Sequence, residues 1–159
     1  MRISRSKGQT AIEMIFILGI LFIGLIMIVP SYTDNNTNIM IVSYVRSSLS
    51  KAIDYLNTGV MTDDELYKST LNPLLSQITE NPHLSIKNFT SEESITEVNI
   101  TILISTPYLS IQNLNASIVS NLTEFLEKDL VENYRFTNNT GVLKYGGKRV
   151  NIEIDVVRG

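Results

Sequence analysis

Residues 7–30 read KGQTAIEMIFILGILFIGLIMIVP. From Met14 to Val29 this stretch holds sixteen consecutive residues without a charged or polar side chain. A helix from Thr10 to Val29 is about 30 Å long at 1.5 Å per residue, and this length matches the hydrocarbon thickness of a bilayer. We therefore expect one membrane-spanning helix near the N-terminus, with the rest of the chain attached to it.

One carboxylate, Glu13, lies near the start of this apolar stretch. An ionised side chain at the centre of a bilayer costs about 2.5–3.5 kcal/mol or more, so an acid inside such a segment is a candidate functional residue. The alternative is a carboxylate that reaches the membrane interface or is protonated there. Glu13 is the residue of the stretch that needs an explanation.

A short basic leader precedes the apolar stretch. It contains Arg2, Arg5 and Lys7 and no acid, which predicts that the N-terminus stays inside the cell and that the C-terminal part lies outside. A secretory signal ends in small residues at its cleavage site. Here the apolar run ends in the bulky sequence from Ile28 to Tyr32, so we expect the helix to remain as an anchor.

The boundary between the leader and the apolar run resembles a class III signal sequence, the signal of type IV prepilin-like proteins. More narrowly, it is similar to the archaeal pilin pattern Q-x-S-x-E-x-x-x-L. Ala11 stands in place of the usual serine and Ile17 in place of the usual leucine. The resemblance covers about the first 30 residues, and its motif consists of Lys7, Gly8, Gln9 and Glu13.

This resemblance implies how the chain is processed and with what it assembles. A prepilin peptidase would cut between Gly8 and Gln9 on the cytoplasmic side, and an assembly ATPase with a platform membrane protein would extract the helix from the lipid. Cleavage removes all three leader charges and leaves an amino group four residues from Glu13. In a filament of packed apolar helices, Glu13 would pair with the N-terminal amine of a neighbouring pilin subunit, because a buried charge needs a partner.

The sequence divides into four segments. They are a cleaved leader (1–8), a transmembrane or filament-core helix (9–30), a polar linker with an amphipathic helix (31–58) and an extracellular head (59–159). The second part of the third segment carries an apolar stripe at helical spacing, formed by Ile39, Val42, Val45, Leu49, Ala52 or Ile53, and Leu56. Whether residues 31–38 are helical stays open at this point.

The head shows the patterns of a small α+β domain with four or five mostly antiparallel strands and one packed helix. Thr62 and Glu65 have capping-box spacing before a short helix that Pro73 interrupts. The predicted strands cover residues 84–89, 97–104, 134–137, 142–145 and 150–156, with turns at 91–94, 138–141 and 146–147. The inward residues of the strands 97–104 and 150–156 are Val98, Ile100, Ile102, Ile104, Val150, Ile152, Ile154 and Val156. The packed helix covers about 115–132, and its buried face is formed by Ile118, Leu122, Phe125, Leu126 and Leu130.

The composition argues against most catalytic and nucleic-acid-binding functions. There is no cysteine and only one histidine, His83, and outside the leader the chain has 10 basic and 16 acidic residues, a net charge of −6. The acidic clusters at 63–65, 92–93 and 153/155 are interpreted as a helix start, a turn and an exposed strand face. We therefore predict no catalytic residue, no metal site, no cofactor and no nucleic-acid partner.

Asparagine sequons of the form N-x-S/T are enriched. Six occur, against about three expected by chance for this composition. They fit a domain exposed outside the membrane, although a polar surface encoded by an AT-rich genome would also produce them. The candidate glycosylation sites are Asn35, Asn88, Asn99, Asn115, Asn121 and Asn138.

These observations lead to one expected function and two alternatives. The expected function is a structural subunit of an archaeal type IV-like pilus, a major or a minor pilin that serves surface adhesion. It would be located in the cytoplasmic membrane as a precursor and at the cell surface after assembly. The first alternative is a membrane-anchored binding module or secretion-system pseudopilin that does not form a pilus, and the second is an anchored enzyme.

Overall fold

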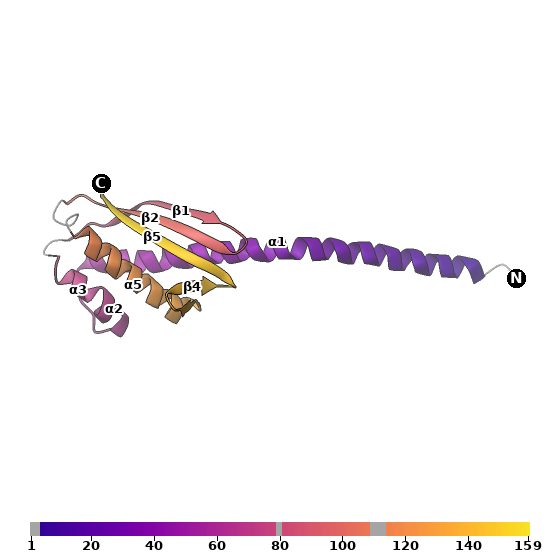
Figure 1. The fold of residues 1–159 in the computed structure, drawn as a ribbon, viewed down its shortest axis with the longest axis horizontal. Coiled ribbons are helices and arrows are strands. Elements are labelled where there is room, and N and C mark those ends of the chain that lie inside the picture. Colours follow the sequence, from indigo (N-terminus) through magenta and orange to yellow (C-terminus); the bar gives the residue numbers. More distant parts are fainter. Residues whose placement is uncertain (1–3, 79–80, 109–113) are drawn as a thin grey trace. The chain divides into compact units, whose positions relative to one another are not determined.

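The computed structural model describes residues 4–78, 81–108 and 114–159, with the side chains at 4–10 and 30–35 outside the description. The chain separates into two compact units, Met1–Asn36 and Thr37–Gly159, and each is described by itself. The helices are α1 (Ser4–Thr58), α2 (Glu65–Thr70), α3 (Asn72–Leu75) and α5 (Asn115–Tyr134). The strands are β1 (Ser85–Glu93), β2 (Glu97–Thr106), β3 (Thr137–Asn139), β4 (Val142–Tyr145) and β5 (Lys148–Arg158) (Figure 1).

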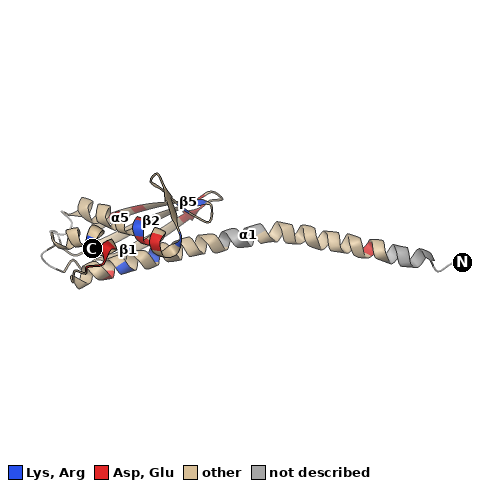
Figure 2. Cartoon of the chain, turned by 90° about the horizontal axis from the view of Figure 1, so that it is seen from below, with Lys and Arg blue, Asp and Glu red and all other residues tan. Residues whose placement is uncertain are grey.

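The first unit is helical and contains the apolar part of α1. Residues Ala11–Val29 form 19 helical residues with a mean hydropathy of 2.9, long and apolar enough to cross a membrane. In Figure 2 this segment is drawn almost entirely in the colour of uncharged residues. The helix is assigned without a break through Pro30 and through residues 31–38, which answers the question that the sequence left open.

The second unit is built on a mixed sheet of five strands in the order β1-β2-β5-β4-β3. Three neighbouring pairs are antiparallel, and β2 pairs with β5 in parallel. The predicted α+β class with a mostly antiparallel sheet and a packed helix is therefore confirmed. The parallel pair arises because the chain leaves β2, passes through α5 and the β3–β4 hairpin, and returns to β5 in the direction of β2.

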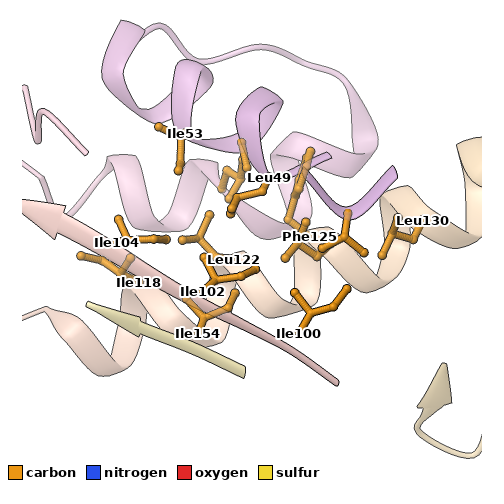
Figure 3. Packing of buried hydrophobic residues seen from close by; sticks show 14 of the residues in the cluster. Leu49, Ile53, Ile100, Ile102, Ile104, Ile118, Leu122, Phe125, Leu130 and Ile154 are labelled. Carbon is orange, nitrogen blue, oxygen red and sulfur yellow. The ribbon is translucent and has the colours of Figure 1, made fainter. Parts of the chain in front are cut away.

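The core lies between the inner face of the sheet and two helices, α5 and the residues of α1 that belong to the second unit. Figure 3 shows side chains from α1, α5, β2 and β5 filling this space. Each inward residue predicted for β2 is at most 1 % exposed, and the five predicted core residues of α5 are fully buried. On β5, Val150, Ile154 and Val156 are buried and Ile152 is half-buried. Period-two and period-3.6 patterns thus identified both packed faces correctly.

Five local predictions are wrong at least in part. On α1, Ile39 is 66 % exposed and Ile41 is fully buried, so the stripe starts at Ile41. Its other predicted members are confirmed, since Val42 is half-buried and Val45, Leu49, Ala52, Ile53 and Leu56 are buried. Asp64, not Thr62, caps α2, because the Asp64 Oδ1 accepts the Leu66 N–H at 3.1 Å. The turn predicted at 91–94 begins later, since β1 continues to Glu93. Residues 134–137 end α5 and begin β3 instead of forming one strand, and the turn predicted at 138–141 is shorter, because Asn138 and Asn139 belong to β3.

The hairpin between β4 and β5 turns at two glycines, as predicted. Gly146 and Gly147 have φ angles of 58° and 85°, the left-handed values that a two-residue type I′ turn requires. A Cβ atom at Gly146 would also lie 2.7 Å from the Thr37 Cγ2. Both the backbone conformation and the close approach of α1 therefore favour glycine at this position.

Candidate functional site

The residues of the predicted signal motif lie at the start of α1. The backbone at Lys7, Gly8 and Gln9 is helical, and Glu13 follows one turn after Gln9. Residues four apart in a helix lie on the same face. A chain that begins at Gln9 would therefore carry its amino group and the Glu13 carboxylate on one face of the helix.

The apolar part of α1 presents large side chains on all sides. Those of Met14, Phe16, Leu21 and Phe22 are between 59 % and 69 % exposed, and Ile26 and Met27 exceed 70 %. An apolar surface of this extent is unfavourable in water and requires lipid or other apolar helices around it. At Gly19 and Gly24, no described atom outside the local helix lies within 4 Å of the position that a Cβ would take.

The six sequons differ in how their amide groups are engaged. Asn88 and Asn138 are exposed; the Asn138 Nδ2 lies 3.3 Å from the Glu127 Oε2. The other described sequons are half-buried, and the Asn99 Oδ1 accepts the Asn151 Nδ2 at 2.7 Å on the outer face of the sheet. The Nδ2 atoms of Asn115 and Asn121 donate to the carbonyls of Val156 at 3.2 Å and Ser117 at 2.7 Å. The side chain of Asn35 lies outside the described residues.

The structure also contains a buried acid that the sequence interpretation did not single out. Asp129 of α5 is 2 % exposed, and its Oδ1 lies 3.6 Å from the Lys51 Nζ and accepts the Asn133 Nδ2 at 2.8 Å. The Lys51 ammonium also lies 4.8 Å from the centre of the Tyr134 ring. The signal was present in the sequence, because Asp129 interrupts the apolar stripe of α5 one residue before Leu130.

These contacts change the acid–base properties of two residues. The hydrogen bond to Tyr134, helped by the Asp129 charge, raises the pKa of Lys51 despite partial burial. Burial, followed by the Asp129 charge, raises the pKa of Tyr67. Lys51 of α1 thus forms an ion pair with Asp129 of α5, supported by hydrogen bonds. We interpret this group of side chains as one that holds the two helices together and not as a reactive site.

We expect the Lys51→Met variant to lose about 1–2 kcal/mol of unfolding free energy, because the buried Asp129 carboxylate loses its cation while the apolar stem is kept. Lys51 itself is 42 % exposed, so water limits the effect. Denaturation in urea measures the loss, and Lys51→Arg is the control that keeps the charge.

The ion pair of Lys51 with Asp129 also predicts how the unfolding free energy changes at alkaline pH. Since the pKa of Lys51 is raised above its usual 10.5, its stabilisation is complete below that pH and disappears as the pH rises through the folded-state pKa. The raised pKa of Tyr67 acts in the same direction. A variant Lys51→Met whose stability falls as steeply above pH 10.5 as that of the wild type would contradict this assignment.

The remaining candidate groups do not converge on a reactive site. His83 is exposed, with its ring 5.7 Å from that of Tyr108, in a loop as predicted. Glu92 and Glu93 lie in β1, and the Glu93 Oε2 accepts the Asn38 Nδ2 at 2.7 Å. Among the residues that the structure describes, no three His, Cys, Asp or Glu side chains gather as a metal site would require.

Comparison of the chain with protein-family models, with curated proteins and with solved structures finds no match.

Proposed function

We propose that this chain is a structural subunit of an archaeal type IV-like pilus, processed between Gly8 and Gln9 and assembled through its N-terminal helix. The observation that carries the proposal is the apolar helix of Ala11–Val29, none of whose residues is buried, together with the predicted signal motif and basic leader at its start. The motif and the apolar residues lie within one helix, α1.

Cleavage would allow the same helix to occupy two environments in turn, the lipid bilayer and the core of a filament. Before cleavage, three leader charges hold the N-terminus in the cytoplasm while the apolar residues span the lipid. After cleavage, the leader charges are gone and the helix carries an amine and the Glu13 carboxylate four residues apart. Packing against other copies then replaces lipid around the same apolar side chains, and pairing of the two charges between subunits sets their axial register.

The second unit supplies the surface that the filament would display. The outer side of its sheet is polar, with Thr90, Asn99, Thr101, Asn151 and Glu153 among its residues. A prepilin peptidase cleaves the proposed subunit, and an assembly ATPase with a platform membrane protein extracts it from the lipid. The subunit then polymerises with identical or related pilins. Its proposed place is the membrane as a precursor and the cell surface as part of an adhesive pilus, as a major or a minor subunit.

Processing is the direct test. We expect intact-mass analysis of the protein from its native cells to show a chain that begins at Gln9, shorter by the eight leader residues. A Gly8→Ile variant should keep the leader, because a bulky side chain replaces the small residue at the cut, whereas Ser6→Ala should be processed normally. A native chain that still begins at Met1 would overturn the proposal and favour a permanently anchored, unpolymerised protein.

We also propose N-glycosylation, with Asn88 as the principal acceptor among the described sequons. Asn88 and Thr90 are both exposed on the edge strand β1, so the acceptor amide and the hydroxyl that the sequon requires are accessible together. Asn115 is engaged with the main chain of β5 and its Oδ1 is buried, which disfavours attachment there.

Glycopeptide mass spectrometry of the native protein measures the occupancy of each sequon. We expect occupancy at Asn88 that disappears equally in Asn88→Gln and Thr90→Ala, while Asn115 stays unmodified. Occupied Asn115 together with bare Asn88 would contradict the assignment.

A further inference from the structure

Strand β5 is paired along one edge and largely open along the other. On one side β2 pairs with residues 149–158 of β5 in parallel. On the other side β4 pairs only with Lys148, Arg149 and Val150. Within the described part of the chain, no strand follows the second edge beyond Val150. Counting the described residues alone, eight residues of a strand in the middle of the sheet have a neighbouring strand on one side only.

The hydrogen bonds to β2 show which main-chain groups face the open edge. The N–H groups of Arg149 and Gly159 donate to the carbonyls of Thr96 and Thr106, each at 2.9 Å, so the odd-numbered residues point toward β2. Successive residues of a strand direct these groups to opposite sides. The even-numbered residues from 152 to 156 therefore direct their N–H and C=O groups to the open edge.

One of these residues is capped by side chains and two are not. The Val156 N–H donates to the Asp155 Oδ1 at 2.8 Å, and the Val156 carbonyl accepts the Asn115 Nδ2 at 3.2 Å. For Ile152 and Ile154, no hydrogen bond on the open side is formed within the described residues. Ile152 is half-buried and Ile154 is 7 % exposed, and main-chain groups at such depth are nearly always paired in folded proteins.

A hollow of about 310 Å³ lies beside this gap. It opens where the chain turns away from β5 at Gly141, which has a φ angle of 81°. Its apolar lining comes from Leu126, Leu143 and Val150, all at most 5 % exposed. The polar part of its lining includes Thr123, Glu127, Arg149 and Asn151. An unpaired strand edge with an apolar hollow for alternate side chains is the arrangement that accepts an added strand.

We propose that this gap binds a short extended peptide segment of a partner protein, which adds to β5 as an antiparallel strand in line with β4. Its main chain pairs with Ile152 and Ile154. Its side chains opposite these two residues point inward over Leu126, because directly paired residues of antiparallel strands share a face. The proposal does not depend on pilus assembly.

The dimensions of the gap decide the kind of occupant. Pairing with β4 ends the gap at Val150, and the Asn115 side chain ends it at Val156. The main-chain groups of two residues, Ile152 and Ile154, are therefore available to an added strand. The edge strand of a second copy, β1, has nine residues and is longer than the gap between Val150 and Val156. A short flexible segment fits the gap, whereas a folded sheet edge does not.

The test uses the full chain in detergent micelles, labelled for NMR, and the peptide acetyl-Thr-Val-Thr-Val-Thr-amide. Without peptide, we expect the Ile152 amide to exchange with solvent about tenfold faster than the Asn151 amide, which faces β2. Saturating peptide should slow exchange at Ile152 about tenfold and leave Asn151 unchanged. The same peptide methylated on both valine nitrogens should have no effect, because those N–H groups would pair with β5.

A matched pair of variants tests whether the peptide binds in the hollow. Thr123→Trp fills the hollow from α5 and should abolish the slowing, while Ser120→Trp, at an exposed position of the same helix, should preserve it. An Ile152 amide that is already as protected as Asn151, or one that the peptide leaves unchanged, would overturn the proposal. So would protection that grows with protein concentration alone, since that result would identify a second copy as the occupant.

Discussion

Replacing Glu13 with valine is expected to leave membrane insertion intact and to reduce incorporation into filaments more than a hundredfold. Insertion should be equal or better, because a carboxylate opposes partitioning into lipid, by about 2.5–3.5 kcal/mol at the centre of a helix and by less near its end, where Glu13 lies. Incorporation should fail because, in the proposed filament, the N-terminal amine of the neighbouring subunit would stay buried without its partner. Breaking a buried ion pair in this way costs about 3–5 kcal/mol per contact.

The measurement compares the variant chain in the membrane fraction with the variant chain in sheared filaments. Glu13→Gln is the informative second variant, since it keeps the size and the hydrogen-bonding groups of the side chain and removes only its charge. If charge pairing sets the register, glutamine should fail almost as completely as valine, whereas Glu13→Asp should retain partial incorporation. Normal incorporation of Glu13→Val would remove the role proposed for this residue.

Replacing Phe125 with alanine is expected to lower the unfolding free energy of the second unit by about 3–5 kcal/mol, through lost burial and a residual cavity. Phe125 is fully buried on α5, and its ring lies 5.1 Å from that of Tyr67. Typical domains have a total stability of about 5–15 kcal/mol, so this loss is a large share of the whole.

Tyrosine fluorescence during urea denaturation measures the change, because the chain has seven tyrosines and no tryptophan. Val131→Ala on the same helix is the control; Val131 is 37 % exposed, and its truncation should cost less than about 1 kcal/mol. A loss below about 1 kcal/mol for Phe125→Ala would mean that the packing between α5 and the α2 region contributes little to stability.

The candidate sites were predictable to different degrees. The predicted signal motif and Glu13 are local features, so the prediction could be made from consecutive residues alone, and both the motif and its function stay proposals. The six sequons were equally visible, but only the fold distinguishes the exposed Asn88 from Asn115, whose amide binds the main chain of β5. The pairing of Asp129 with Lys51 joins residues 78 positions apart, and a local pattern carries no information about such a contact.

By itself, the sequence determined the apolar helix of residues 11–29, the α+β class and the inward faces of β2, β5 and α5. Each of these follows from hydrophobic spacing along a few consecutive turns or residues, which is a local property. Tertiary structure alone decided the parallel pairing of β2 with β5, the burial of Ile41 in place of Ile39, and the end of the β4 pairing at Val150, beyond which no described strand pairs with this edge of β5. These features depend on which distant segments meet and where β4 ends its pairing, and the free energy of such contacts is not encoded in the spacing of neighbouring residues.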